Sequence, residues 1–124
     1  MNKTRTKRGT TLLGLIPMLL MLVTAEATAH AMLDHAEPRV GNTVATAPRE
    51  VTLWFTQKLE AAFSTITVTD SAGQRVDTGK ARVSGNQMSV SLRSGGPGTY
   101  RVNWRVLSVD THRTDGNFTF RVGQ

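Results

Sequence analysis

The chain has 124 residues, with 15 Lys and Arg against nine Asp and Glu, no cysteine and a formal net charge of +6. This length excludes a multidomain enzyme, since a single domain commonly takes about 100–150 residues. The lack of cysteine excludes disulfides, thiolate zinc sites and a Cys-ligated blue-copper centre. The positive charge alone would suggest nucleic acid or an anionic surface as a partner.

Residues 1–29 have the pattern of a cleavable secretory signal peptide. Basic residues come first, and an apolar run that is interrupted only by Gly14 and Pro17 follows at 12–23. This run is too short to span a bilayer, which needs about 20 residues. A retained signal anchor is the alternative, but the short run and the cleavage pattern that follows it favour removal.

The expected cleavage point lies before His30, because Ala27-Thr28-Ala29 fits the small-x-small rule. Ala25-Glu26-Ala27 and Ala29-His30-Ala31 fit the same rule, so the cleavage point stays open. The sequence therefore predicts a signal peptide at 1–29 and one domain at 30–124. We expect this domain to be exported to the periplasm, or secreted, and not inserted in the membrane.

Removal of the leader halves the net charge. The leader holds four basic residues and Glu26, so residues 30–124 keep 11 basic and eight acidic residues, a net charge of +3. The 11 basic residues are scattered and form no run. Because nucleic-acid binding needs them clustered on one element, we interpret them as a solvated polar face and expect no nucleic-acid partner.

The exported domain is predicted to be all-β. Apolar residues alternate with polar ones in five segments, 51–55, 65–69, 88–92, 100–106 and 117–122. Turn signals separate the runs: Pro38 with Gly41-Asn42, Pro48, 70–73, 84–86, 95–98 and Asp115-Gly116. Their spacing indicates a Greek-key, immunoglobulin/cupredoxin-like β-sandwich of about seven strands. Residues 58–63 are expected to form one irregular turn at most.

The candidate metal ligands are His30, Asp110 and His112. Cleavage before His30 frees an α-amine that can chelate a metal together with the imidazole Nδ1 of the same residue. In an extended segment Asp110 and His112 would point to the same side. Three nitrogens and one carboxylate oxygen suit square-planar Cu(II). The sequence therefore predicts one Cu(II) ion per chain.

The exported segment resembles the periplasmic copper-resistance CopC family over nearly its whole length. The most specific motifs are G-T-Y-x-V-x-W-x-V at 98–106, S-x-D-x-H at 108–112 and G-x-F-x-F at 116–120. Further matches lie at 30–33, 37–41, 47–55 and 63–70. The resemblance implies a copper-binding Greek-key sandwich with a Cu(II) site at His30, Asp110 and His112. It also implies a membrane partner of the CopD type.

Two departures from the family limit this comparison. Gln57 stands where some relatives carry a glutamate near the metal, and the exported segment has only Met32 and Met88, with no methionine cluster for Cu(I). Met88 is expected to lie in the core. His35 is expected to be an exposed side chain.

Two other functions stay open. The first is an exported immunoglobulin-like interaction module in which the histidines are incidental. The second is a copper monooxygenase with an N-terminal histidine brace, which the short chain and the carboxylate ligand disfavour. No Ser, His and acid trio stands in a supporting motif, so we expect no enzyme activity. The expected role is to sequester periplasmic Cu(II) or deliver it to a CopD-type inner-membrane copper transporter.

Overall fold

The computed structural model describes residues 31–123. They form eight β-strands and one short 3-10 helix: β1 (Leu33–Glu37), β2 (Thr43–Val44), β3 (Glu50–Phe55), η1 (Ala61–Phe63), β4 (Thr65–Thr69), β5 (Asp77–Ser84), β6 (Gln87–Leu92), β7 (Gly98–Leu107) and β8 (Arg113–Val122). The described residues include no helix with the length and hydropathy needed to cross a bilayer. The all-β prediction is confirmed.

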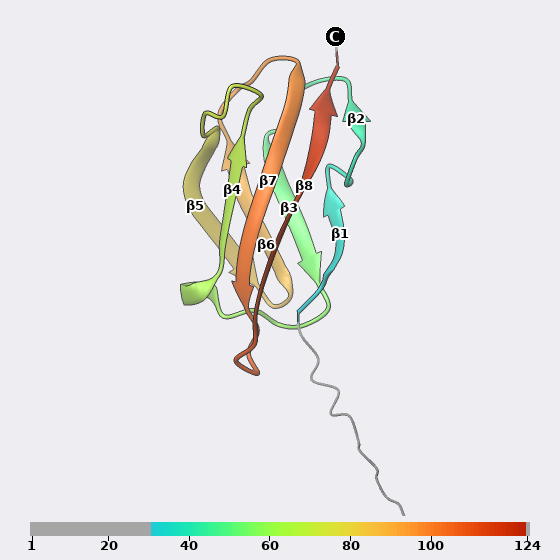
Figure 1. Cartoon of the computed structure of the whole chain (residues 1–124). Helices are drawn as coiled ribbons and strands as arrows, with labels where there is room; N and C mark the ends of the chain where they lie inside the picture. The colour runs from blue at the N-terminus through green and yellow to red at the C-terminus, as the bar shows by residue number, and fades with distance from the viewer. Residues whose placement is uncertain (1–30, 124) are drawn as a thin grey trace, which may run out of the picture.

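The strands form two four-stranded sheets packed face to face (Figure 1). One sheet has the order β1-β3-β6-β5 and the other the order β2-β8-β7-β4. All neighbouring strands are antiparallel except β2 and β8. The start of β1, η1 and the β7–β8 loop lie at the same end of the sandwich (Figure 1).

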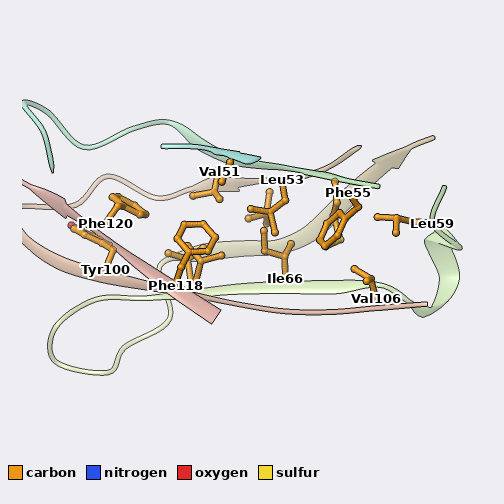
Figure 2. Packing of buried hydrophobic residues seen from close by; sticks show 14 of the residues in the cluster. Val51, Leu53, Phe55, Leu59, Ile66, Tyr100, Val106, Phe118 and Phe120 are labelled. Atoms are coloured by element: carbon orange, nitrogen blue, oxygen red, sulfur yellow. The ribbon is translucent and has the colours of Figure 1, made fainter. Parts of the chain in front are cut away.

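The core consists of the inward-facing residues that the period of two predicts. Val51, Leu53 and Phe55 of β3 are buried in the same apolar cluster as Val102 and Val106 of β7. Figure 2 shows this apolar layer running along the whole sandwich. Met88 is fully buried, as predicted. Burial of these side chains is the main stabilising contribution to the fold.

The predicted turn at Asp115-Gly116 is wrong, because both residues lie inside β8. Gly116 is paired with Trp104 on β7. A Cβ atom on Gly116 would lie 2.5 Å from Cζ2 of the Trp104 indole. The glycine is therefore explained by close packing against an aromatic ring, and not by a reversal of the chain.

Candidate metal site

The β7–β8 loop places Asp110 and His112 at one end of the sandwich. The extended backbone expected for these residues is wrong. The chain makes a tight turn here, and Thr111, between Asp110 and His112, has a φ of 70°. The Thr111 N–H donates to the Ser108 carbonyl at 2.9 Å, and the Ser108 N–H donates to the His112 carbonyl at 3.0 Å. A positive φ is costly for a β-branched residue, so the surrounding hydrogen bonds must hold this turn in place.

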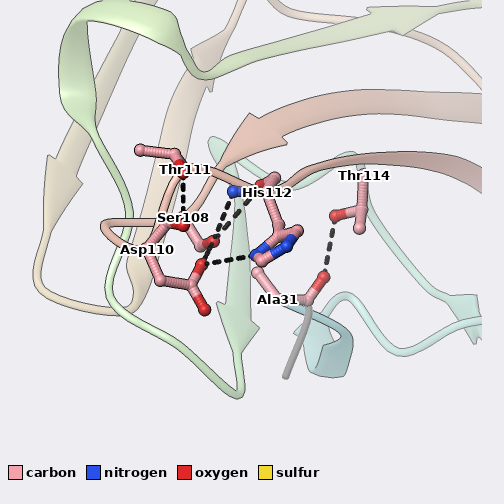
Figure 3. Close-up of polar contacts among 6 residues, drawn as sticks. All are labelled: Ala31, Ser108, Asp110, Thr111, His112 and Thr114. Carbon is pink, nitrogen blue, oxygen red and sulfur yellow. Dashed lines mark hydrogen bonds and ion pairs between the residues drawn. The ribbon is translucent and has the colours of Figure 1, made fainter. Parts of the chain in front are cut away.

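The turn brings the two predicted ligands together. His112 Nδ1 lies 3.2 Å from Asp110 Oδ1, and the two side chains are 36% and 41% exposed. Figure 3 shows the carboxylate and the ring facing each other. The hydrogen bond from Ser108, followed by that from His112, lowers the pKa of Asp110. The carboxylate is therefore ionised at neutral pH, which is the form that binds a cation.

Ser108 connects both ligands to the interior. Its side chain is fully buried. The Ser108 hydroxyl donates to Asp110 Oδ1, and Ser108 Oγ accepts the His112 N–H at 3.3 Å. Sequence analysis placed Ser108 in the S-x-D-x-H motif without giving it a role. A buried hydroxyl that contacts both ligand residues orients them, in the way that outer-shell partners orient metal ligands.

The beginning of the described chain is attached to the same end. Ala31 is fully buried, and its carbonyl accepts a hydrogen bond of 2.8 Å from Thr114 Oγ1. Met32 and Thr56 exchange two further bonds, from Met32 N to Thr56 Oγ1 at 3.0 Å and from Thr56 N to the Met32 carbonyl at 2.9 Å. Figure 3 shows Ala31 beside the His112 ring. These contacts fix the point at which the chain enters the sandwich next to Asp110 and His112.

His30 itself lies outside the described residues, as do the predicted signal peptide and its cleavage point. Among residues 31–123 no group of three or more His, Cys, Asp or Glu side chains could hold a metal ion. Within the described part of the chain, Asp110 and His112 therefore form a pair of side chains that needs further donors to hold a metal ion.

The remaining residues considered near the metal have other placements. His35 is exposed and lies on the outer face of the other sheet, with its Nδ1 2.7 Å from Asp34 Oδ2. Its ring stacks on Trp54 at a centroid distance of 4.3 Å. Met32 is 59% exposed. Gln57 is half-buried in the loop after β3.

Replacing Ser108 by alanine is expected to weaken Cu(II) binding by about 10-fold or more, as loss of outer-shell partners commonly does. It also removes buried hydrogen bonds, so the free energy of unfolding should fall by about 1–3 kcal/mol. Competition titration and thermal unfolding measure the two effects, and the electron paramagnetic resonance spectrum of Cu(II) reports a change in ligand geometry.

Ser64→Ala is the matched control for this prediction. Ser64 is also buried, and its hydroxyl bonds the Glu60 carbonyl at 2.9 Å and the Leu107 N–H at 3.2 Å. Both of these partners lie outside the pair formed by Asp110 and His112. The Ser64 variant should lose stability but keep both copper affinity and spectrum. An equal loss of affinity in both variants would contradict a positioning role for Ser108.

Comparison with known proteins places this geometry in a family. The CopC domain family model matches residues 33–123. Protein YobA of Escherichia coli K12 is 38% identical over 105 residues, which cover 82% of this chain and 85% of YobA. Copper transport protein CutJ of Bacillus subtilis is 33% identical over 115 residues, which cover 88% of this chain but only 21% of CutJ.

A solved structure agrees with these sequence matches. The crystal structure of CopC from Methylosinus trichosporium OB3b superposes with a TM-score of 0.71 at 32% identity. The superposition covers 76% of this chain and 94% of that protein. Sequence motifs, sandwich topology and family match agree over the same residues, and the chain therefore belongs to the CopC family.

Proposed function

We propose that the exported chain binds one Cu(II) ion in the periplasm through His30, Asp110 and His112. The observation that supports this most is the pairing of Asp110 with His112 beside the attached Ala31. His30 is bonded directly to Ala31, and consecutive Cα atoms are about 3.8 Å apart. The α-amine and imidazole of His30 would join the carboxylate and imidazole of the loop as four donors suited to Cu(II).

The biological role that we propose is to hold copper and deliver it to a membrane transporter. The family membership supports a role in copper handling. The relative CutJ, named as a copper transport protein, contains a counterpart of this chain as about a fifth of its length. We infer that a separate membrane partner of the CopD type performs the transport step for this chain. Because the side chains of Asp110 and His112 are partly exposed to solvent, the ion could be exchanged at this end of the sandwich.

One additional glycine placed before His30 is expected to abolish tight Cu(II) binding. It converts the α-amine of His30 into an amide, which removes one donor and the chelate ring. For the unmodified exported chain, free copper at 100 times the Kd should stabilise the fold by about 2.7 kcal/mol. This corresponds to a rise in Tm of about 10–20 °C for a domain of this size. Intact mass measures the N-terminus and the copper stoichiometry, and thermal unfolding measures the shift.

A glycine added after Gln124 is the control, because it lengthens the chain equally at the other terminus. This variant should retain the full copper-dependent rise in Tm. Tight binding by the N-terminally extended chain would contradict the role of the His30 amine. If copper does not raise the Tm of the unmodified chain, the proposal that the chain binds copper is wrong. The immunoglobulin-like interaction module then becomes the better interpretation.

A further inference from the structure

The outer face of the β2-β8-β7-β4 sheet carries a group of arginines that are scattered in the sequence. Arg101 and Arg105 lie on β7, and Arg113 and Arg121 lie on β8. All four are exposed and occupy positions that alternate with the buried residues of their strands. We call these four residues the arginine face. The pairing of β7 with β8 places Arg121 diagonal to Arg101, and Arg113 diagonal to Arg105. Such diagonal neighbours have Cα atoms about 7–8 Å apart.

The positive charge of the arginine face is only partly offset by a carboxylate, that of Asp115, which lies opposite Arg105. None of its members belongs to an ion pair within the described residues. Arg101 donates to Asn117 Oδ1 at 2.7 Å, and Arg121 donates to Thr99 Oγ1 at 2.9 Å, so their partners are neutral. Asp115 is the one acidic residue among the outward positions of β4, β7 and β8. Four arginines and one aspartate give this face a net charge of +3.

The outer face of the other sheet has a different charge pattern. Glu37 and Glu50 lie there, and Arg82 is paired with Glu50 at 2.8 Å. Within the described residues, the β2-β8-β7-β4 sheet therefore gathers four arginines without an ion pair on one face, whereas Lys80 on β5 of the other sheet has no ion pair but no basic neighbours on its own face except the paired Arg82. A one-sided field of this kind attracts and orients an anionic partner.

The surface beside the arginines is polar and shallowly hollowed. A depression of about 330 Å³ is lined by Arg105 and Asp115, by Trp104 and by polar neighbours, which are Thr65, Thr67, Asn103 and Asn117. These hydroxyl and amide groups can donate hydrogen bonds to phosphate oxygens. The exposed large hydrophobic residues of the described chain, Met32, Val40, Phe63 and Val109, lie on other segments. None of these exposed residues belongs to the arginine face, and Trp104, which lines the depression, is half-buried, so the face is poor in the exposed apolar anchors that stable protein interfaces use.

The spacing of the arginines favours an extended phosphate surface over a single small anion. Arg101 and Arg105 are four residues apart on one strand, which is about 13 Å. Arg113 and Arg121 are eight residues apart, which is about 27 Å. One small anion cannot reach all four guanidinium groups, whereas a layer of lipid headgroups can. Arginine binds phosphate with two parallel hydrogen bonds, which makes it suited to this contact.

We propose that the arginine face binds the surface of an anionic phospholipid bilayer. This inference does not depend on copper binding, since no member of the arginine face is a proposed ligand. Bound in this way, the exported domain would lie on the membrane through the outer face of one sheet. The end of the sandwich that carries Asp110 and His112 would remain at the side of the contact.

The proposal is tested by co-sedimentation of the metal-free exported chain with lipid vesicles. The signal peptide must be removed, because its basic and apolar residues would bind vesicles themselves. We expect binding to vesicles of phosphatidylglycerol and phosphatidylcholine, and loss of binding as salt is raised. Arg101→Gln with Arg105→Gln should lower the partition coefficient by about 25-fold, at about five-fold per arginine.

The control variant is Arg49→Gln with Arg93→Gln, which removes the same charge from exposed positions outside the arginine face. It should lower the partition coefficient by less than about two-fold, because Arg49 and Arg93 flank β3 and β6 of the opposite sheet and salt screens charges that are not at the contact. Equal losses in both variants would overturn the proposal in favour of a net-charge effect. Equal binding to pure phosphatidylcholine, or no binding to anionic vesicles, would also overturn it. If the chain does not bind anionic vesicles, an acidic protein becomes the partner to test.

Discussion

Replacing His112 by alanine is expected to weaken Cu(II) binding by more than about 100-fold. Loss of a residue that only orients a ligand commonly costs 10–100-fold, and loss of the ligand itself should cost more. The His112 side chain is 36% exposed at the end of the sandwich, outside the apolar core. The variant should therefore fold normally. Competition titration against a copper chelator measures the affinity, and thermal unfolding of the metal-free chain measures the fold.

His35→Ala is the matched control, because it also removes an imidazole that lies beside an aspartate. His35 Nδ1 is 2.7 Å from Asp34 Oδ2, compared with 3.2 Å between His112 and Asp110. It lies on β1, stacked on Trp54, away from the β7–β8 loop. Copper affinity should be unchanged in this variant. If His35→Ala weakens binding as much as His112→Ala, or if neither does, the proposed ligand set is wrong.

The fold could be predicted because its strands have two different faces. In β3, β4, β6 and β7 the buried apolar residues recur at every second position, and this alternation is visible in the sequence, although Thr52 of β3 and Ser89 of β6 are buried between them. β1 and β5 were not predicted, since five of the eight residues of β5 are exposed in succession and the register shifts within both strands. The structural role of Gly116 could not be predicted, because a glycine is needed there to make room for the Trp104 ring on the neighbouring strand.

The site was only partly readable from the sequence. The motif at 108–112 identified Asp110 and His112, but the reason given for their convergence, an extended backbone, does not apply. The orienting role of Ser108 and the attachment of Ala31 by Thr114 depend on contacts between distant segments. The arginine face was also missed, since four residues spread over 101–121 become neighbours only when β7 pairs with β8.

Replacing Asp77 by alanine is expected to lower the free energy of unfolding by about 2–4 kcal/mol. The carboxylate is fully buried and accepts the Val68 N–H at 2.8 Å. Arg75 binds it with two hydrogen bonds, of 2.8 Å and 2.7 Å. Because Val68 lies on β4 and Asp77 on β5, these bonds join the edges of the two sheets. Removal of one member of a buried pair costs about 3–5 kcal/mol, and the half-exposed Arg75 lowers that figure because water can solvate it.

Asp70→Ala is the control for this prediction, measured by denaturant unfolding under the same conditions. Asp70 also accepts two backbone N–H groups, from Ala72 and Gln74, both at 2.9 Å. These bonds are exposed, so water can replace the lost acceptor. The expected loss is about 1 kcal/mol or less. A loss at Asp77 no larger than that at Asp70 would contradict the role of Asp77 as a buried link between the sheets.

The contribution of Asp77 should also depend on pH. Burial raises the pKa of Asp77, but the hydrogen bond from Arg75, the Val68 N–H and the charge of Arg75 outweigh it, so the pKa is lowered. A carboxyl group with a lowered pKa in the folded state stabilises the fold fully above its unfolded pKa, about 3.9. This stabilisation is lost as the pH falls below that value and through the folded pKa. The difference in unfolding free energy between the unmodified chain and Asp77→Ala should therefore be constant from pH 7 to about pH 5 and shrink under acid. A difference that grows as the pH falls would show that the pKa of the buried carboxyl group is raised in the folded protein, contrary to this prediction.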